Sequence, residues 1–215
     1  MKEFIQSIRK CSLCEREFRN LNTESKPCLE AYEKWLPENI QCLFIAESPP
    51  SKDIYFYNCQ KEDSLRKNLL ALLGISESGC EGLCEFKQRG FFLTDSLKCR
   101  INKKNDKFRM DIKGDKSRKR IPTKVIQNCK SILKREIDLL SKQKGMKKVV
   151  VLGNTALKAL KMVCFSELKN YRAARNCGKK IVSQGFEILI FVLPINRNSK
   201  YLGEKEGDLR NFVFD

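Results

Sequence analysis

Residues 41–50 read Gln-Cys-Leu-Phe-Ile-Ala-Glu-Ser-Pro-Pro, an apolar run that ends at a glutamate and two prolines. A short apolar run closed by prolines is typical of a buried strand followed by a rigid loop. Similar short apolar runs follow at residues 91–94, 149–152 and 188–193. Helices are expected in the intervals, at residues 64–73, 122–141 and 156–162, and a short one at 2–10.

This alternation of apolar strands and helices predicts an α/β fold. Strands that are apolar throughout need cover on both faces, so we expect a three-layer α/β/α sandwich with a central, mostly parallel four-stranded sheet. In such sheets the ligand site lies at the carboxyl ends of the strands. The loops that begin at Glu47, Asp95, Gly153 and Pro194 are therefore expected to converge on one pocket.

The chain shows no internal repeat and no linker, so residues 1–215 are predicted to form one domain with a basic insertion at 101–121. We expect a monomer. No window holds eighteen consecutive apolar residues, which excludes a membrane partner, and the N-terminus lacks the features of a secretory signal. The sequence therefore predicts a cytoplasmic protein, associated with the nucleoid if the host is a prokaryote.

The net charge is +17, from 43 Lys and Arg against 26 Asp and Glu. Such a surplus points to a polyanionic partner, usually DNA or RNA; the alternative is a host whose proteins are all lysine-rich. Residues 98–124 hold twelve Lys or Arg and three Asp. This stretch is predicted to clamp the DNA backbone, or else to be a solvated loop. Its expected DNA contacts are Lys98, Arg100, Lys116, Arg118, Lys119 and Arg120.

Cysteine is abundant, with eleven residues, and histidine is absent. The odd count and the expected compartment argue against a disulfide framework. The spacing Cys11-Ser-Leu-Cys14 suggests metal or cluster ligation instead. The lack of histidine excludes Cys/His zinc sites and every acid–base mechanism that uses histidine.

Five segments together resemble the family-four uracil-DNA glycosylases, iron–sulfur enzymes of the uracil-DNA glycosylase superfamily. The segments are Cys11-Ser-Leu-Cys14, Phe44-Ile-Ala-Glu-Ser-Pro-Pro50, Phe92-Leu-Thr-Asp-Ser-Leu-Lys-Cys-Arg100, Pro122-Thr-Lys-Val-Ile-Gln-Asn-Cys129 and Val149-Val-Val-Leu-Gly-Asn-Thr-Ala-Leu-Lys-Ala-Leu160. Their order and spacing cover nearly the whole chain. The sequence departs from the family pattern at two places: Asp95 replaces an asparagine, and Arg197-Asn-Ser199 stands where the family has His-Pro-Ser.

The resemblance implies that Cys11, Cys14, Cys99 and Cys129 hold a four-iron four-sulfur cluster with a structural role. Zinc, bound by the same four thiolates, is the alternative. Cys80 and Cys84 are expected to be loop thiols, although either could replace one of the four ligands.

The same resemblance implies a DNA glycosylase, which flips its base out of the helix and holds it in a tight pocket. Glu47 is predicted to stabilise the oxocarbenium sugar or to orient the attacking water. Arg197 or Asn198 takes the place of the family's histidine beside the departing base, where an arginine would stabilise negative charge. Phe56, or as second choice Tyr55, is expected to stack on the base; an aromatic strand in the core is the alternative.

Asp95 is expected to read the base edge. An ionised carboxylate only accepts hydrogen bonds and suits a base with an amino group, whereas a protonated one mimics asparagine and suits uracil. Asn154 and Thr155, which open a helix, and Ser199 are expected to contact phosphate; ordinary helix capping is the alternative for the first two.

These observations favour a DNA glycosylase that excises a deaminated or modified base by hydrolysis of its N-glycosidic bond, in base-excision repair. The alternative is a non-catalytic iron–sulfur nucleic-acid-binding protein that has kept the fold. A zinc-stabilised nuclease is not favoured, because no Asp/Glu cluster is spaced for two metals.

Overall fold

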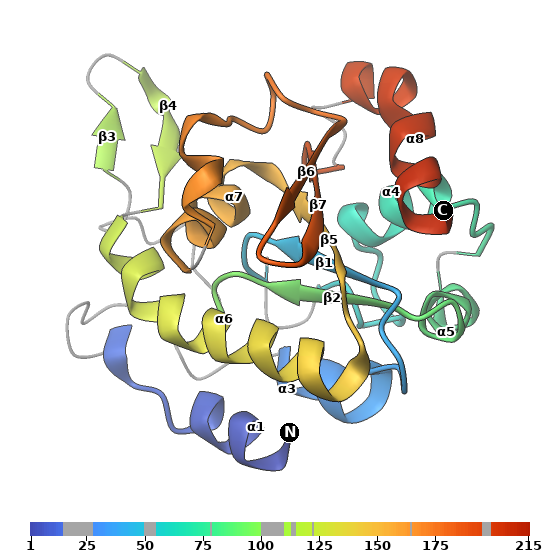
Figure 1. Cartoon of the computed structure of the whole chain (residues 1–215), viewed down its shortest axis with the longest axis horizontal. Coiled ribbons are helices and arrows are strands. Elements are labelled where there is room, and N and C mark those ends of the chain that lie inside the picture. Colours follow the sequence, from blue (N-terminus) through green and yellow to red (C-terminus); the bar gives the residue numbers. More distant parts are fainter. Residues whose placement is uncertain are drawn as a thin grey trace.

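The computed structural model describes residues 1–14, 28–49, 55–77, 79–99, 110–112, 115–121, 123–163, 165–194 and 199–215. Its centre is a sheet of five strands in the order β2-β1-β5-β7-β6. The strands are β1 (Cys42–Ala46), β2 (Phe91–Asp95), β5 (Lys148–Leu152), β6 (Lys179–Ser183) and β7 (Phe186–Phe191). The first four in the sheet order run parallel, and β6 pairs antiparallel with β7 at the edge (Figure 1).

The predicted α/β sandwich with a mostly parallel sheet is confirmed, but the sheet has five strands instead of four. The missed strand, β6, differs from the others because most of its side chains face solvent. Lys179 and Lys180 are exposed, and Val182 is 76 % exposed. A strand at a sheet edge need not be apolar, so it lacks the pattern that revealed the four central strands.

Helices cover both faces of the sheet. One layer holds α6 (Thr123–Lys144) and α7 (Gly153–Val163), which pack against each other, with α1 (Lys2–Arg9) beside α6. The opposite layer holds α4 (Ser64–Leu72) and α8 (Ser199–Phe214), as Figure 1 shows. Shorter elements are α3 (Cys28–Glu30), η1 (Ala31–Trp35), α5 (Cys80–Gln88) beside β2, and η2 (Ser166–Asn170).

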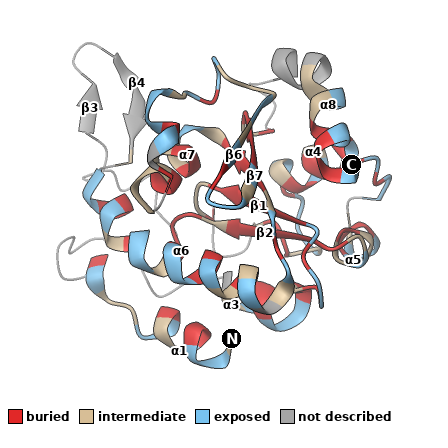
Figure 2. Cartoon of the chain, viewed as in Figure 1, coloured by how far each residue is buried: buried red, intermediate tan, exposed pale blue. Residues whose placement is uncertain are grey.

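The core lies on both faces of the central strands, where buried residues are concentrated (Figure 2). All five side chains of β1 are buried. Phe44 of β1 packs against Phe86 and Phe91, with ring centroids 5.6 and 5.8 Å apart. This burial explains why the four parallel strands are apolar without alternation.

The basic insertion contains a two-stranded antiparallel hairpin of β3 (Met110–Ile112) and β4 (Asp115–Arg120), separate from the main sheet (Figure 1). No helix of the described residues is long and apolar enough to span a bilayer.

The structure contains a disulfide between Cys59 and Cys80, whose Cα atoms lie 5.0 Å apart. Cys59 and Cys80 are therefore not thiols, and the expectation of a loop thiol at Cys80 is wrong. Their 21-residue separation in sequence carries no pairing signal, and the fold brings them together at the start of α5.

Candidate active site

The carboxyl ends of the parallel strands bring together a glutamate and a threonine that lie 108 residues apart. Glu47 directly follows β1, and Thr155 lies in the first turn of α7. The Thr155 hydroxyl donates a hydrogen bond to Glu47 Oε2 over 2.7 Å. Asp95, the last residue of β2, pairs in register with Ala46, so the Asp95 backbone lies one residue from Glu47. These contacts bring three of the four predicted loops together at one edge of the sheet, although the lining of the adjacent pocket includes Asp95 and neither Glu47 nor Gly153.

The turn after β2 holds the backbone of Glu47. The Glu47 carbonyl accepts hydrogen bonds from Leu97 N at 3.0 Å and from Ser96 Oγ at 2.8 Å. Ser96 N donates to the Ala46 carbonyl at 2.9 Å. The side-chain and backbone contacts together fix both the position and the orientation of the Glu47 carboxylate.

Gly153 forms the junction between β5 and α7. Its φ of +89° is a backbone conformation that residues with a side chain rarely adopt. A Cβ there would also lie 3.4 Å from Leu193 Cβ, which follows β7. Glycine therefore lets α7 begin immediately at the strand end, which places Thr155 beside Glu47.

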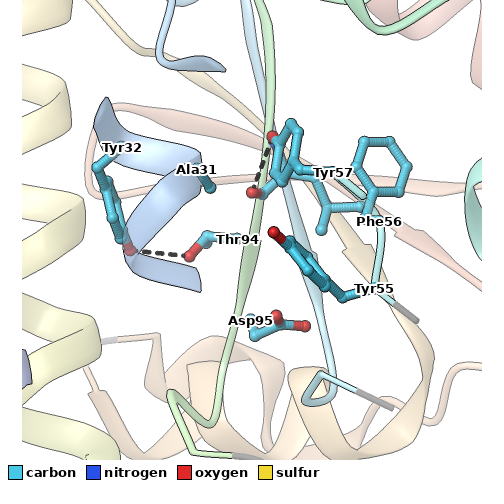
Figure 3. A pocket seen from close by; sticks show the side chains of 8 residues that line it. Ala31, Tyr32, Tyr55, Phe56, Tyr57, Thr94 and Asp95 are labelled. Carbon is cyan, nitrogen blue, oxygen red and sulfur yellow. Dashed lines mark hydrogen bonds between the residues drawn. The ribbon is translucent and has the colours of Figure 1, made fainter. Parts of the chain in front are cut away.

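A narrow pocket lies next to these groups (Figure 3). It is lined by Ala31, Tyr32, Tyr55, Phe56, Tyr57, Leu93, Thr94 and Asp95. The Tyr55 ring lies between Asp95 and the inner wall, and its hydroxyl donates to the Glu30 carboxylate. Burial, followed by this contact with Glu30, raises the pKa of Tyr55. The space that remains holds little more than a water molecule, so a base would need Tyr55 to move.

Phe56 and Tyr57 form the inner wall of the pocket. Phe56 is 4 % exposed, packs against Tyr57 and Phe86 with centroids 4.9 and 5.3 Å away, and points away from Asp95 (Figure 3). The Tyr57 hydroxyl donates to the Leu93 carbonyl at 3.1 Å and accepts from Leu93 N at 2.7 Å. The Tyr57 hydroxyl thereby pairs with the backbone N–H and C=O of Leu93 on β2, the strand at the edge of the sheet. Phe56 is thus fixed in the core, although residues 55–57 form a turn and not the aromatic strand of the alternative interpretation. Tyr55 is the half-buried ring at the pocket.

The pKa of Asp95 is raised from 3.8 to about 7. Burial is the main cause; the Lys98 ammonium opposes it, while the carboxylates of Glu136, Asp63 and Glu47 add to it. Near neutral pH Asp95 therefore divides between its protonated and ionised forms. Asp95 can therefore donate a hydrogen bond in its protonated form and accept one in its ionised form.

Lys98 was predicted to contact DNA, and the structure contradicts this. Its side chain is 1 % exposed, and Nζ donates to Glu136 Oε2 at 2.5 Å, to Thr94 Oγ1 at 2.7 Å and to the Asp95 carbonyl at 2.7 Å. A buried ammonium engaged in this way cannot reach a phosphate. Tyr32 completes the network: its hydroxyl donates to Glu136 and lies 3.2 Å from Thr94 Oγ1.

Glu136, which the sequence analysis missed, is completely buried on α6. Its neighbours on the same helix face, Leu133, Ile137 and Leu140, are also buried. A carboxylate on the apolar face of an amphipathic helix is a recognisable signal, because a buried charge requires a partner. The signal does not identify the partner as Lys98.

Three of the predicted cluster cysteines are neighbours. Cys14, Cys99 and Cys129 are buried thiols, and Cys11 is half-buried after α1. A hydrogen bond with Cys14 lowers the pKa of Cys129, whereas burial and the nearby Cys99 act in the opposite direction. Thiolates are the ligands that iron–sulfur clusters and structural zinc use, so the residue types are suitable. Within the described ranges, however, no group of three or more Cys, His, Asp or Glu has an arrangement that could hold a metal ion.

The remaining predicted residues have varied positions. Arg100, Arg197 and Asn198 lie outside the described residues. The backbone places Lys116, Arg118, Lys119 and Arg120 on β4 and Ser199 at the start of α8; their side chains are outside the described part. Asn154 is exposed at the start of α7, where its Oδ1 accepts a hydrogen bond from Ala173 N at 2.9 Å.

The fold and the site define an α/β protein with a carboxylate and an aromatic pocket at the carboxyl edge of its sheet. The family model described as the Uracil DNA glycosylase superfamily matches residues 33–212. The chain therefore belongs to the uracil DNA glycosylase superfamily, whose members are typically DNA glycosylases and act on DNA. The matched region begins after Cys11 and Cys14. No curated protein matches the chain.

Proposed function

We propose that the protein is a DNA N-glycosylase that flips a deaminated or modified base out of DNA and hydrolyses its N-glycosidic bond. The observation that carries this proposal is the hydrogen bond between Thr155 and Glu47 at the strand edge, next to Asp95 and the aromatic pocket. A carboxylate held in one orientation is what a glycosylase needs beside a developing oxocarbenium ion.

In the reaction, the bond between C1′ of the sugar and the base nitrogen breaks, and the base leaves with the bonding electrons. Glu47 stabilises the positive sugar and orients a water molecule toward C1′. The water supplies the hydroxyl of the abasic sugar, and its remaining proton ends on the departing base. Arg197 or Asn198 is assigned to the side of the leaving base, where a guanidinium would stabilise its negative charge.

Tyr55, rather than Phe56, is the ring that we assign to base stacking. It is half-buried at the pocket, whereas Phe56 is packed among other aromatic residues. Asp95 is assigned to the base edge. In its protonated form it donates to a carbonyl, as uracil requires, and in its ionised form it accepts from an amino group. Uracil-type bases and modified pyrimidines therefore both belong to the proposed substrate class.

We assign a four-iron four-sulfur cluster to Cys11, Cys14, Cys99 and Cys129, with zinc as the less favoured occupant. The proximity of Cys14, Cys99 and Cys129 supports this assignment. When bound, the group would join the segment after α1 to the turn after β2 and to α6, a structural role. The resemblance to family-four enzymes belongs to the same proposal. The basic hairpin, with Lys116, Arg118, Lys119 and Arg120, is assigned to the DNA backbone together with Arg100 and Ser199.

The experiment that tests the function uses duplexes that each carry one modified base. After incubation with the protein, alkali converts abasic sites into strand breaks. We expect breaks at one class of base, and we expect Glu47→Gln to lose them while DNA binding is retained. Glu38→Gln, an exposed residue before β1 at the opposite end of the strand, is the matched control and should remain active.

Binding without excision of any base would contradict the proposal. It would support instead a non-catalytic nucleic-acid-binding protein, which the absence of histidine from the whole sequence favours.

A further inference from the structure

The turn at residues 171–178, which leads into β6, is attached to the active-site edge (Figure 1). Ala173 N donates to Asn154 Oδ1 at 2.9 Å, and Gly178 N donates to the Ile190 carbonyl of β7 at 2.9 Å. Asn154 immediately precedes Thr155, the residue that holds Glu47. The turn is thus connected to the proposed catalytic carboxylate through two consecutive residues of α7.

Internal hydrogen bonds give this turn a defined shape. The Arg172 carbonyl accepts from Arg175 N at 3.1 Å and from Asn176 N at 2.9 Å, and Arg172 N donates to Asn176 Oδ1 at 2.8 Å. Ala173 is 2 % exposed and anchors the turn in the core. The exposed residues Arg172 and Arg175 are therefore presented from a fixed backbone.

Positive charge is concentrated around this turn. Lys179, at the start of β6, is exposed, and Nζ of Lys161 donates to the Tyr171 carbonyl at 2.6 Å. Burial, and then the nearby Arg172, lowers the pKa of Lys161. Among the described residues, no carboxylate forms a salt bridge with either arginine. The acidic residue beside Gly178, Asp208, pairs with Lys205 at 3.2 Å.

We propose that Arg172 and Arg175 bind phosphates of the DNA strand that passes the active-site edge. The proposal rests on the proposed function, because it takes DNA as the partner. A guanidinium binds phosphate through two parallel hydrogen bonds, and a fixed backbone lowers the entropy lost when the contact forms. The turn lies outside the basic insertion, so the two surfaces hold the DNA backbone from separate parts of the chain.

The test compares the parent with an Arg172→Gln/Arg175→Gln variant. The probe is an unmodified duplex with a fluorescent end, titrated at several salt concentrations. We expect weaker binding on every sequence, and a slope of log affinity against log salt that is smaller by about one for each arginine lost. Thermal melting checks that the variant remains folded.

The matched control is Lys142→Gln/Lys147→Gln, which removes the same charge. Both lysines are exposed, and Lys147 directly precedes β5, at the end of the strand opposite the active site. An equal change of slope in the two variants would show that only overall charge matters and would overturn the proposal. An unchanged salt slope in the arginine variant would also overturn the proposal.

The outcomes for the two proposals are separable. If the parent binds DNA without excising any base and the arginine variant loses the salt-dependent contacts, the surface stands and the glycosylase assignment fails. If the parent excises a base and the arginine variant binds DNA like the parent, the glycosylase assignment stands and the proposed arginine surface fails. A parent that does not bind DNA overturns both.

Discussion

Lys98 Nζ lies 2.5 Å from Glu136 Oε2, and the two side chains are 1 % and 0 % exposed. The pair joins the turn after β2 to the middle of α6, directly behind Asp95. Removal of either partner leaves an uncompensated charge in the interior. We therefore expect Lys98→Met to lower the free energy of unfolding by about 3–5 kcal/mol.

Urea unfolding measures this loss, and Lys98→Met/Glu136→Met provides the comparison. The double variant should recover much of the stability, because replacement of a buried pair by apolar side chains is close to neutral. A double variant as unstable as the single one would mean that Lys98 is needed for its bonds to Thr94 and Asp95, and not for the ion pair.

The raised pKa of Asp95 predicts a pH-dependent stability. In the unfolded chain the carboxyl ionises near 3.8, and in the folded protein near 7, so between these values the folded state holds more protons. The unfavourable contribution of Asp95 is absent below the lower value, grows as pH rises, and is complete above about 7. We expect Asp95→Asn to gain stability over the parent at about pH 8 but not at about pH 4, as measured by urea unfolding.

The same titration predicts a change of base preference with pH. Below about 7 the protonated Asp95 can donate to a carbonyl, and above it the carboxylate accepts from an amino group. The ratio of uracil to cytosine-type excision should therefore fall as pH rises through this value in the parent. In Asp95→Asn the ratio should not change with pH. The same pH profile in both proteins would show that Asp95 does not contact the base.

Thr155 is predicted to act through Glu47. Thr155→Val keeps the shape of the side chain but loses the hydroxyl that donates to Glu47 Oε2. Because a hydrogen bond to a charged group contributes about 1.5–3 kcal/mol, we expect the single-turnover excision rate to fall roughly ten- to hundred-fold, with DNA affinity unchanged. Thr155→Ser, which keeps the hydroxyl, should stay near the parent rate. Equal rates for both variants would remove Thr155 from the site.

The cysteine assignment predicts a coloured protein. Anaerobically purified parent should be brown and contain about four irons per chain, as a cubane cluster does. Cys99→Ser should lose the colour and much of the soluble yield. Cys84→Ser, which changes an exposed thiol, should keep both. Stoichiometric zinc without iron would contradict the cluster and leave the four-cysteine site.

Much of the fold follows from local sequence. The apolar runs at β1, β2, β5 and β7 predict a sheet covered on both faces, because strands of that composition cannot face water. Their carboxyl ends predict where Glu47, Asp95 and the start of α7 meet, since parallel strands end at the same edge. The ordered motifs led to the superfamily that the matched region 33–212 also shows.

Only the tertiary structure shows which distant residues contact one another. Lys98 belongs to a basic run by sequence, yet it is buried, because it pairs with Glu136, which lies 38 residues away on α6. Tyr55 and Phe56 are adjacent and both line the pocket. Only the packing of Tyr57 and Phe86 against Phe56 shows that this second ring is fixed in the core. Composition and spacing indicate which segments must be buried, which charges require a partner if buried, and where a strand ends. Which distant residue packs against or pairs with each of them depends on the packing of the whole chain.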